Sequence, residues 1–286
     1  MSFGTLSSRI RQGTAWTWIA EKHKPSLPTD LATSVMDLEA LDRLHAKQGR
    51  STARVVFHGP SGPLPVYLKR HFRLTWRERL AALLNPSGRH TPGGAEFAHL
   101  ATVQSLGVLV PEVIAAGERI GPWGHVQSFL MVAELTGCEP LHEAIPQLKA
   151  SLDPDAFARL KRELTIEMAV ITAKLHASKM FHKDLYLCHF YLDMSLSAPI
   201  GSRLRLIDLH RLGEHKLTAI RWRFKDLGQL LYSTVGVAGV ERRDLLRFWQ
   251  CYRQVMRLRL PRWQMWLVYQ KSARYLDHNE RRGGRS

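Results

Sequence analysis

The chain has 286 residues, of which 45% are hydrophobic, enough to bury the core of one large domain or of two lobes that share a cleft. It carries 41 Lys and Arg residues against 25 Asp and Glu residues, which gives a formal net charge of +16 and a pI near 10.2. Nucleic acid, an anionic membrane face and phosphorylated substrates are therefore admissible partners. Cys138, Cys188 and Cys251 lie far apart without a CxxC spacing, which argues against a disulfide framework and a structural zinc site.

The sequence favours a cytoplasmic protein. No apolar stretch reaches the roughly 18 residues of a membrane span. Arg9, Arg11, Glu21 and Lys22 interrupt the N-terminal region, so it does not have the pattern of a signal peptide. Cysteines without a pairing pattern fit a reducing compartment.

The first predicted elements form a small mixed lobe. Residues 51–57 and 65–69 have strand composition and flank the turn-rich 58–63, a pattern that predicts a hairpin. After a basic insertion, apolar residues at helical spacing predict a helix over 95–106. Two further strands are expected at 108–111 and 128–132, followed by a linker at 135–137.

The second half of the chain is mainly helical. An apolar stripe predicts a long helix over 155–179, with Asp153-Pro154 as its start. Two short strands are expected at 190–192 and 203–207, each beside a polar cluster. From about Trp222 the chain is expected to be helical and basic.

Two residues of the first half meet the needs of phosphoryl transfer. This reaction needs a lysine to hold nucleotide phosphates, and an acid to anchor that lysine. Lys69 ends a predicted strand and Glu96 opens the following predicted helix, so the two can meet across the small lobe.

The second half supplies the two carboxylates that such a reaction requires. Asp184 follows the long predicted helix, in the segment FHKDLYLCHF, and is the candidate base for the acceptor hydroxyl. Asp208 ends a predicted apolar strand, in LIDLHR, and is the candidate ligand for Mg²⁺. A helix, a polar loop, a short hairpin and then an aspartate is the order in which a kinase places base and metal ligand.

The segments HKDLYLCHF, LIDLHR and RWRFKDL, in this order, resemble those of the bacterial lipopolysaccharide core kinases, which phosphorylate heptose or Kdo sugars of the inner core. The resemblance covers roughly residues 44–232. The combination of Cys188-His189-Phe190 with Asp208-Leu209-His210-Arg211 is more specific than either segment alone.

The resemblance implies an ATP- and Mg²⁺-dependent kinase whose acceptor is a sugar hydroxyl of an anionic glycolipid. It implies that Lys69 contacts the ATP phosphates, that Glu96 pairs with Lys69, and that Asp184 is the general base. It further implies that Asp208 binds Mg²⁺ and that Asp226 braces the catalytic loop from a helix. His182, in the same loop as Asp184, is predicted to belong to the catalytic group.

Three features depart from the eukaryotic protein-kinase pattern. His189 stands where an asparagine would ligate a second metal, and Mg²⁺ prefers oxygen to imidazole, so His189 is expected to contact phosphate or a bridging water. Asp208-Leu209-His210 replaces Asp-Phe-Gly. No GxGxxG lies between the first two strands, where phosphate contact would depend on Lys47, Arg50 or Ser51.

The predicted fold class is α+β, a two-lobed protein-kinase-like fold with a small antiparallel-sheet N-lobe carrying one helix and a mainly helical C-lobe. The predicted domains are an N-terminal extension with the nucleotide-binding N-lobe over 1–137, and a C-lobe over 138–286. The C-lobe would hold the catalytic loop, the metal site and basic C-terminal helices.

Other interpretations stay open. Trp249, Trp263 and Trp266 lie among arginines, a pattern typical of either a helix core or a peripheral contact with the cytoplasmic face of an anionic inner membrane. A kinase of the same fold could instead phosphorylate a protein or a soluble metabolite. The stretch from 208 to 222 is, however, short for the activation segment of a protein kinase. A catalytically silent lipid-binding module is the rival from another class. No nucleic-acid motif accompanies the charge.

Overall fold

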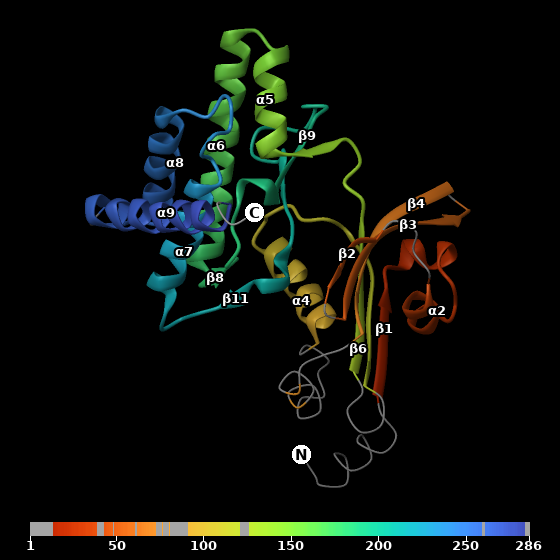
Figure 1. Cartoon of the computed structure of the whole chain (residues 1–286). Coiled ribbons are helices and arrows are strands. Elements are labelled where there is room, and N and C mark those ends of the chain that lie inside the picture. The colour runs from red at the N-terminus through yellow and green to blue at the C-terminus, as the bar shows by residue number, and fades with distance from the viewer. Residues whose placement is uncertain are drawn as a thin grey trace. The chain divides into compact units, whose positions relative to one another are not determined.

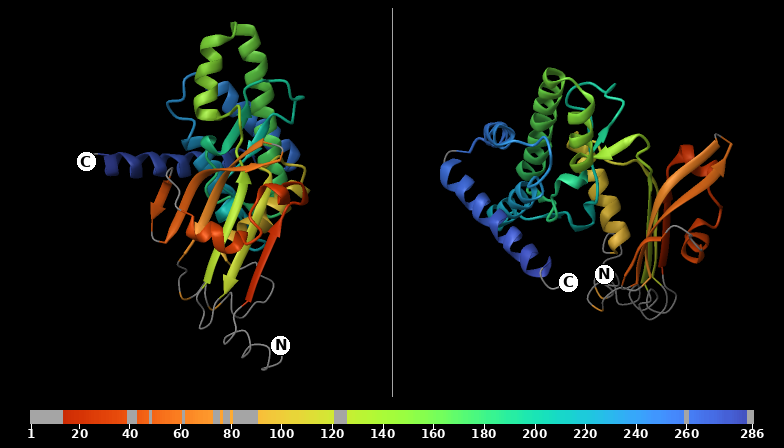
Figure 2. Two further views of the ribbon diagram at one scale, coloured as in Figure 1. Left: turned by 90° about the vertical axis from the view of Figure 1, so that its right-hand side faces the viewer. Right: turned by 45° about the horizontal axis from the view of Figure 1, so that its top comes forward.

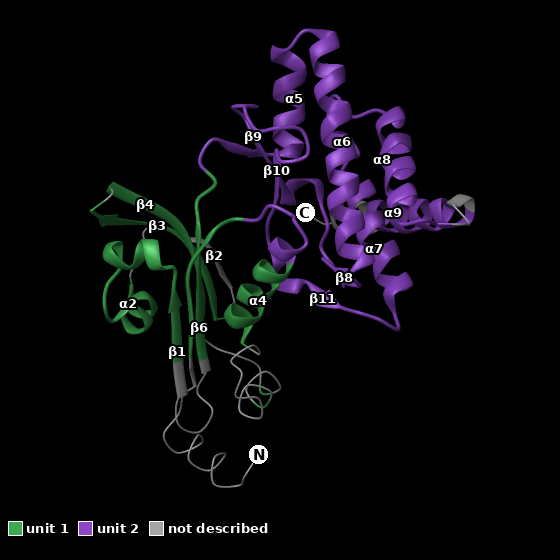
Figure 3. Cartoon of the chain, turned by 180° about the vertical axis from the view of Figure 1, so that it is seen from behind, with its two compact units in different colours: residues 1–102, 111–135 green, residues 103–110, 136–286 purple. Residues whose placement is uncertain are grey.

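The computed structural model describes residues 14–38, 43–47, 49–60, 62–72, 76, 80, 91–120, 126–258 and 261–283. The chain divides into two compact units (Figure 3). Unit 1 comprises residues 1–102 and 111–135, and unit 2 comprises residues 103–110 and 136–286. The division into domains at residue 137 stays a prediction.

Unit 1 is built on a six-stranded antiparallel sheet with the strand order β1-β5-β6-β4-β3-β2 (Figure 1). The strands are β1 (Thr14–Ile19), β2 (Arg43–Lys47), β3 (Arg50–Gly59), β4 (Gly62–His71), β5 (Val113–Ile120) and β6 (Val126–Ala133). β3 and β4 pair from Arg50 opposite His71 to Gly59 opposite Gly62, which confirms the predicted hairpin. The predicted strand at 128–132 lies within β6.

One prediction near this unit needs correction, and three elements of the unit were not predicted. The strand expected at 108–111 is absent, because the backbone is irregular there and Pro111 has no N–H for a ladder. β5 begins instead at Val113. The sequence analysis also missed β1, the 3-10 helix η1 (Glu21–Ser26) and the helix α2 (Leu31–Asp37).

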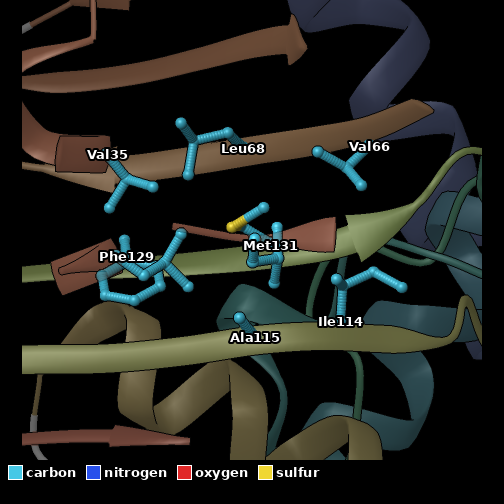
Figure 4. Close-up of a cluster of buried hydrophobic side chains, with 9 residues drawn as sticks. Val35, Val66, Leu68, Ile114, Ala115, Phe129 and Met131 are labelled. Carbon is cyan, nitrogen blue, oxygen red and sulfur yellow. The ribbon is translucent and has the colours of Figure 1, made fainter. Parts of the chain in front are cut away.

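The hydrophobic core of unit 1 lies between the sheet and the η1–α2 segment. Val66 and Leu68 of β4 point to the same face because strand side chains alternate, and Met131 of β6 joins them (Figure 4). From the other side, α2 contributes Leu31 and Val35. The cluster comprises Leu27, Leu31, Val35, Val66, Leu68, Ile114, Ala115, Phe129 and Met131. Burial of these side chains fixes the strand register that places the charged residues of β4.

Arg70 follows Val66 and Leu68 on the same side of β4 and is 1% exposed. Its Nη1 donates hydrogen bonds to the carbonyl oxygens of Val35, at 3.1 Å, and of Leu38, at 2.6 Å, at the C-terminal end of α2. A buried guanidinium thereby satisfies carbonyls that a helix end leaves without intrahelical partners.

We expect Arg70→Met to lower the free energy of unfolding by about 2–4 kcal/mol, because the buried carbonyls of Val35 and Leu38 lose charge-assisted donors. Urea unfolding followed by circular dichroism measures this. Arg50→Met, at an exposed position of the same sheet, is the control. Equal stability of the two variants would contradict the structural role of Arg70.

Unit 2 is mainly helical. Its helices are α5 (Leu141–Ser151), α6 (Pro154–Ala177), α7 (Ala219–Tyr232), α8 (Arg242–Val255) and α9 (Pro261–Gly283). α8 packs on α6 and α9 packs on α7 (Figures 1 and 2). A Cβ at Gly228 of α7 would lie 2.8 Å from the side chain of Lys271 of α9, so this glycine permits the close approach of the two helices.

The start of the long helix confirms its prediction. The Asp153 side chain accepts hydrogen bonds from the backbone N–H groups of Asp155, at 3.1 Å, and Ala156, at 2.9 Å, and Pro154 occupies the first helical turn. None of the described helices has the combination of length and apolar character that a membrane-spanning helix requires.

Short strands between the helices carry the polar segments. They form a three-stranded sheet, β10 (Leu204–Leu206), β9 (Phe190–Asp193) and β7 (Cys138–Pro140), and a two-stranded ladder of β11 (Gly213–Glu214) with β8 (Met180–Phe181). The predicted strands at 190–192 and 203–207 correspond to β9 and β10. Two 3-10 turns, η3 (Leu187–His189) and η4 (Leu209–Arg211), flank them.

Candidate active site

Lys69 and Glu96 form an ion pair inside unit 1. Lys69 Nζ lies 2.6 Å from Glu96 Oε1, and the Glu96 side chain is only 3% exposed. Lys69 belongs to β4 and Glu96 to α4 (Pro92–Ser105), the helix predicted over 95–106. The structure confirms the predicted contact between the two residues.

The start of α4 explains why Glu96 faces the sheet. Thr91 Oγ1 accepts a hydrogen bond from the Gly94 N–H and donates one to Glu118 Oε2 of β5 at 2.7 Å. A Cβ at Gly93 would come within 3.0 Å of the Phe129 carbonyl oxygen, so glycine allows the helix start to lie against β6. These contacts hold the first turn of α4 on the sheet.

The loop of unit 2 that carries Asp184 is braced by Asp226. Asp226 Oδ2 accepts a hydrogen bond from the backbone N–H of His182, and its Oδ1 accepts one from that of Lys183, both at 2.8 Å. Asp226 lies on α7 and is fully buried. The predicted bracing contact is therefore present, and it fixes the backbone immediately before Asp184.

Asp184 is surrounded by donors. Arg211 Nη1 lies 2.7 Å from Asp184 Oδ2, and Lys225 Nζ lies 3.8 Å from Oδ1. Gln229 Nε2 lies 3.4 Å from Oδ1. These contacts orient the carboxylate, and its side chain is still 17% exposed, so it is accessible to another molecule.

Asp208 has a left-handed backbone conformation, with φ 61° and ψ 52°. This conformation is uncommon outside glycine, though aspartate tolerates it better than most residues, and it directs the chain from β10 into η4. His210 Nδ1 lies 2.8 Å from Asp208 Oδ1, and His189 Nε2 lies 3.8 Å from Oδ2.

His189 connects the two aspartates. Its Nδ1 lies 2.7 Å from the backbone carbonyl oxygen of Asp184, a geometry that places the proton on Nδ1. Its other ring nitrogen, Nε2, is the atom nearest to the Asp208 carboxylate. The structure thus brings Asp184, His189 and Asp208 together.

His182 and His176 are fully buried. His182 Nε2 donates to the carbonyl oxygen of Ile207 at 3.0 Å, and His176 lies between Tyr252 Oη, at 2.8 Å, and Asp226 Oδ2, at 3.3 Å. Burial lowers the pKa of both histidines below the ordinary 6.5 and raises that of Tyr252. Both rings are therefore neutral, and His176 donates from Nε2 to Asp226.

These two histidines make stability fall in acid. The unfolded chain takes up their protons as the pH drops through about 6.5 and the folded chain does not, so each destabilises folding by up to about 1.4 kcal/mol per pH unit until its folded pKa is reached. We expect His182→Gln to have a shallower fall between pH 7.5 and 5.5 in urea unfolding. His142→Gln, on an exposed surface, should keep the wild-type slope. Equal slopes for all three proteins would exclude His182 as a contributor.

Sequence reasoning gave no role to three residues that lie close to the Asp184 carboxylate. Arg211 and Lys225 stand in the segments LIDLHR and RWRFKDL, and Gln229 lies one helical turn beyond Lys225. The available signal was their closeness in sequence to Asp208 and Asp226.

Of the residues suggested for the phosphate-covering loop, Ser51 is buried beneath Arg70 and Arg50 is exposed. The Lys47 side chain lies outside the described residues.

The antiparallel sheet with its Lys–Glu pair in unit 1, and the braced Asp184 loop followed by Asp208 in unit 2, define a kinase of the protein-kinase-like α+β fold. Residues 42–252 match the sequence model of the lipopolysaccharide kinase (Kdo/WaaP) family. The chain belongs to this family, as its sequence motifs predict, and it is an enzyme.

Known relatives support this assignment. The chain is 31% identical over 221 residues to the lipopolysaccharide core heptose(I) kinase WaaP of Pseudomonas aeruginosa, a match that covers 75% of this chain and 79% of the relative. It is 28% identical over 241 residues to the enzyme of the same name from Escherichia coli, covering 82% and 87%. A solved structure described as WaaP in complex with acyl carrier protein is similar, with a TM-score of 0.67, 25% identity, and coverage of 91% of this chain and 98% of that one.

Proposed function

We propose that this protein transfers the γ-phosphoryl group of ATP to a hydroxyl of heptose or Kdo in the lipopolysaccharide inner core. The observation that carries the proposal is the Asp184 carboxylate on a loop braced by Asp226, in a chain of the lipopolysaccharide kinase family. The names of the two bacterial relatives favour a heptose as the acceptor sugar.

In this mechanism Asp184 orients the acceptor hydroxyl and takes its proton. The hydroxyl oxygen forms a bond to the γ-phosphorus while the bond from that phosphorus to the bridging oxygen of ADP breaks. Lys69, held by Glu96, neutralises charge on the nucleotide phosphates. Placement of the hydroxyl before the reaction lowers the barrier by removing the entropy cost of bringing two molecules together.

The chemistry of the donors at Asp208 fits Mg²⁺. This ion prefers carboxylate oxygens and retains waters and substrate phosphates as its other ligands, and Asp208 offers a partly exposed carboxylate. When bound, the metal neutralises charge on the phosphates. His189 Nε2 lies 3.8 Å from the same carboxylate, in reach of a bridging water or a phosphate.

We assign His182 a positioning role. A ring that is fully buried cannot touch the substrate, so the contribution of His182 to catalysis is indirect. Its hydrogen bond to the Ile207 carbonyl ties the loop of Asp184 to the residue before Asp208. The ring thereby sets the two carboxylates relative to each other.

The location we propose is the cytoplasm, with peripheral contact at the cytoplasmic face of the inner membrane. Trp263 and Trp266 of α9 are 42% and 59% exposed, and the chain carries a net charge of +16. Exposed tryptophan combined with positive charge is typical of proteins that bind an anionic lipid surface. Trp249, in contrast, packs against the core formed by Leu227, Tyr252 and Val268.

An acyl carrier protein is a second partner that we propose. The structural neighbour is a complex with such a protein. Unit 2 contains a pocket that is lined mainly by apolar side chains of α6, α7, α8 and α9, including Met168, Leu230, Phe248 and Val268. The apolar lining suits part of an acyl chain. Co-purification of the two proteins from a bacterial host, lost when the carrier has no acyl chain, tests this.

The main test is phosphoryl transfer by the purified chain. γ-Labelled ATP and Mg²⁺ are supplied with dephosphorylated core glycolipid, with a generic protein substrate, or with an aminoglycoside. We expect label in the glycolipid alone, and none with Lys69→Met. Labelling of the protein or the aminoglycoside would assign a different acceptor, and no transfer to any of the three would favour a catalytically silent binding module.

A further inference from the structure

Positive charge exceeds negative charge around the catalytic base. Lys183 precedes Asp184, Arg211 lies 2.7 Å from its Oδ2, and Lys225 lies 3.8 Å from its Oδ1. The neighbouring carboxylate of Asp226 is fully buried, and backbone N–H groups and His176 occupy its oxygens. Arg211 and Lys225 therefore share one accessible carboxylate, and Lys183 adds a third positive charge beside it in the chain.

Lys183 has no carboxylate partner among the residues that the structure describes. Its backbone has φ 68°, a conformation that is costly for a residue with a side chain. Its Nζ lies 5.2 Å from the centre of the Trp222 ring, and a Cβ at Gly213 would collide with this ammonium group. The chain thus makes room for a half-buried ammonium and places it on an aromatic face.

Lys225 stands on the same aromatic ring. Its Nζ lies 5.5 Å from the Trp222 ring centre and donates a hydrogen bond to the carbonyl oxygen of Lys183. The Lys225 side chain is 22% exposed. Trp222 therefore makes cation–π contacts with two ammonium groups, one from the catalytic loop and one from α7.

Arg211 has donors to spare. Within the described part of the chain, only its Nη1 is paired, with Asp184, and the side chain is 53% exposed. A guanidinium has five N–H donors and favours bidentate binding of carboxylate or phosphate. Arg211 can therefore bind an anion through its remaining N–H groups while Nη1 stays paired with Asp184.

The crowding of these cations has an energetic cost. Burial lowers the pKa of Lys183, and the charges of Lys225 and Arg211 lower it further, while Asp226 opposes them. Burial likewise lowers the pKa of Lys225; the charge of Asp184 opposes this effect and that of Arg211 adds to it. A bound anion would offset this repulsion. A surface lysine that is paired with a carboxylate, such as Lys216 with Glu214, has its charge balanced without a bound anion.

We propose that Lys183, Arg211 and Lys225 form an anion subsite that binds a carboxylate or phosphate group carried by the acceptor next to its reacting hydroxyl. This subsite rests on the function proposed above, and it gives that function its acceptor class: a sugar with a negative group beside the hydroxyl. The anion fixes the acceptor while Asp184 faces the hydroxyl. The transferred phosphoryl group is the other anion that these cations can meet.

Kinetics with two acceptors separate these two sources. Lys183→Gln and Arg211→Gln are compared with wild type on the core glycolipid and on the same glycolipid with its carboxylates reduced and its phosphates removed. We expect each variant to raise the acceptor KM of the anionic glycolipid about tenfold, which is the effect of about 1.4 kcal/mol, and to change the KM for ATP less than twofold. On the neutral glycolipid the acceptor KM of Lys183→Gln, which leaves the contacts of Asp184 in place, should equal that of wild type.

Two controls complete the experiment. Lys183→Arg should restore most of the affinity for the acceptor, and Lys216→Gln, which removes an exposed lysine of the same unit, should behave as wild type. A similar loss on the neutral acceptor, or a raised KM for ATP, would assign the cations to the transferred phosphoryl group and overturn the proposal. Unchanged acceptor KM values would also overturn it.

Calorimetric titration with inorganic phosphate separates this inference from the proposed function. We expect wild-type protein to bind phosphate, and Lys183→Gln to bind it about tenfold more weakly. If wild type binds phosphate but phosphorylates no glycolipid, the proposed acceptor is wrong and the anion subsite needs another ligand. If wild type phosphorylates the glycolipid and phosphate binding does not depend on Lys183, the subsite is wrong and the kinase function stands.

Discussion

Asp184→Asn should reduce kcat about 10²–10⁴-fold, because asparagine cannot accept the proton of the acceptor hydroxyl. The substitution keeps the size of the side chain and leaves Oδ1 able to accept the hydrogen bond from Gln229. The brace from Asp226 involves only the backbone of His182 and Lys183, so the loop should keep its conformation. Steady-state kinetics with labelled ATP and core glycolipid measure the effect, and thermal unfolding verifies the fold.

The matched control is Asp277→Asn on the exposed face of α9, which should retain wild-type kcat. The KM for ATP should change little in Asp184→Asn, because the nucleotide phosphates are assigned to Lys69 and to the metal at Asp208. An Asp184→Asn enzyme with kcat within twofold of wild type would exclude Asp184 as the base. A large rise in the KM for ATP at unchanged kcat would assign Asp184 to nucleotide binding.

Local sequence patterns were sufficient to predict a contact where the order of strands and helices along the chain already brings two residues together. Lys69 at a strand end and Glu96 at a helix start were predicted to meet, and they do so at 2.6 Å. The contact of Asp226 with the loop of Asp184 was implied by the resemblance to the lipopolysaccharide core kinases and not by a local pattern. For Lys69 and Glu96, the hairpin and the helix that carry them decide where their side chains lie.

Long-range pairing explains what the sequence analysis missed in the fold. β1 pairs with β5, whose residues lie about a hundred positions later in the chain, so no turn signal links the two. α2 has only seven residues, too few for a clear apolar period, and its position depends on the sheet face formed by Val66 and Leu68.

Side chains that reach the base from other segments were also beyond local reasoning. Lys225 lies on α7 and reaches Asp184 only because Asp226 ties that helix to the catalytic loop. The left-handed backbone at Lys183 and Asp208 could not be predicted either, because local preference favours glycine or asparagine there. Tertiary contacts impose both conformations, and both adjoin the carboxylates assigned to catalysis.

Asp226 connects the stability of unit 2 to the loop that carries Asp184. Its carboxylate accepts hydrogen bonds from two backbone N–H groups and from His176, whose other nitrogen contacts Tyr252 of α8. α6, α7, α8 and the catalytic loop therefore meet at one buried group. Removal of an acceptor from such a group leaves several buried donors unsatisfied, each at a cost of about 1–3 kcal/mol.

Asp226→Ala should accordingly lower the free energy of unfolding by about 3–5 kcal/mol and reduce kcat together with it. Asp226→Asn should lower the free energy of unfolding by less than Asp226→Ala. The remaining oxygen still accepts a hydrogen bond from one backbone N–H, while the new NH₂ group faces the other N–H and cannot accept from it. Urea unfolding and kinetics on the same preparations measure both effects, with Asp277→Ala as the exposed control. A loss below about 1 kcal/mol in Asp226→Ala would mean that water replaces the carboxylate. Since the backbone N–H groups of the loop would then keep a water as acceptor, normal kcat in that variant would show that Asp184 does not depend on the Asp226 carboxylate itself.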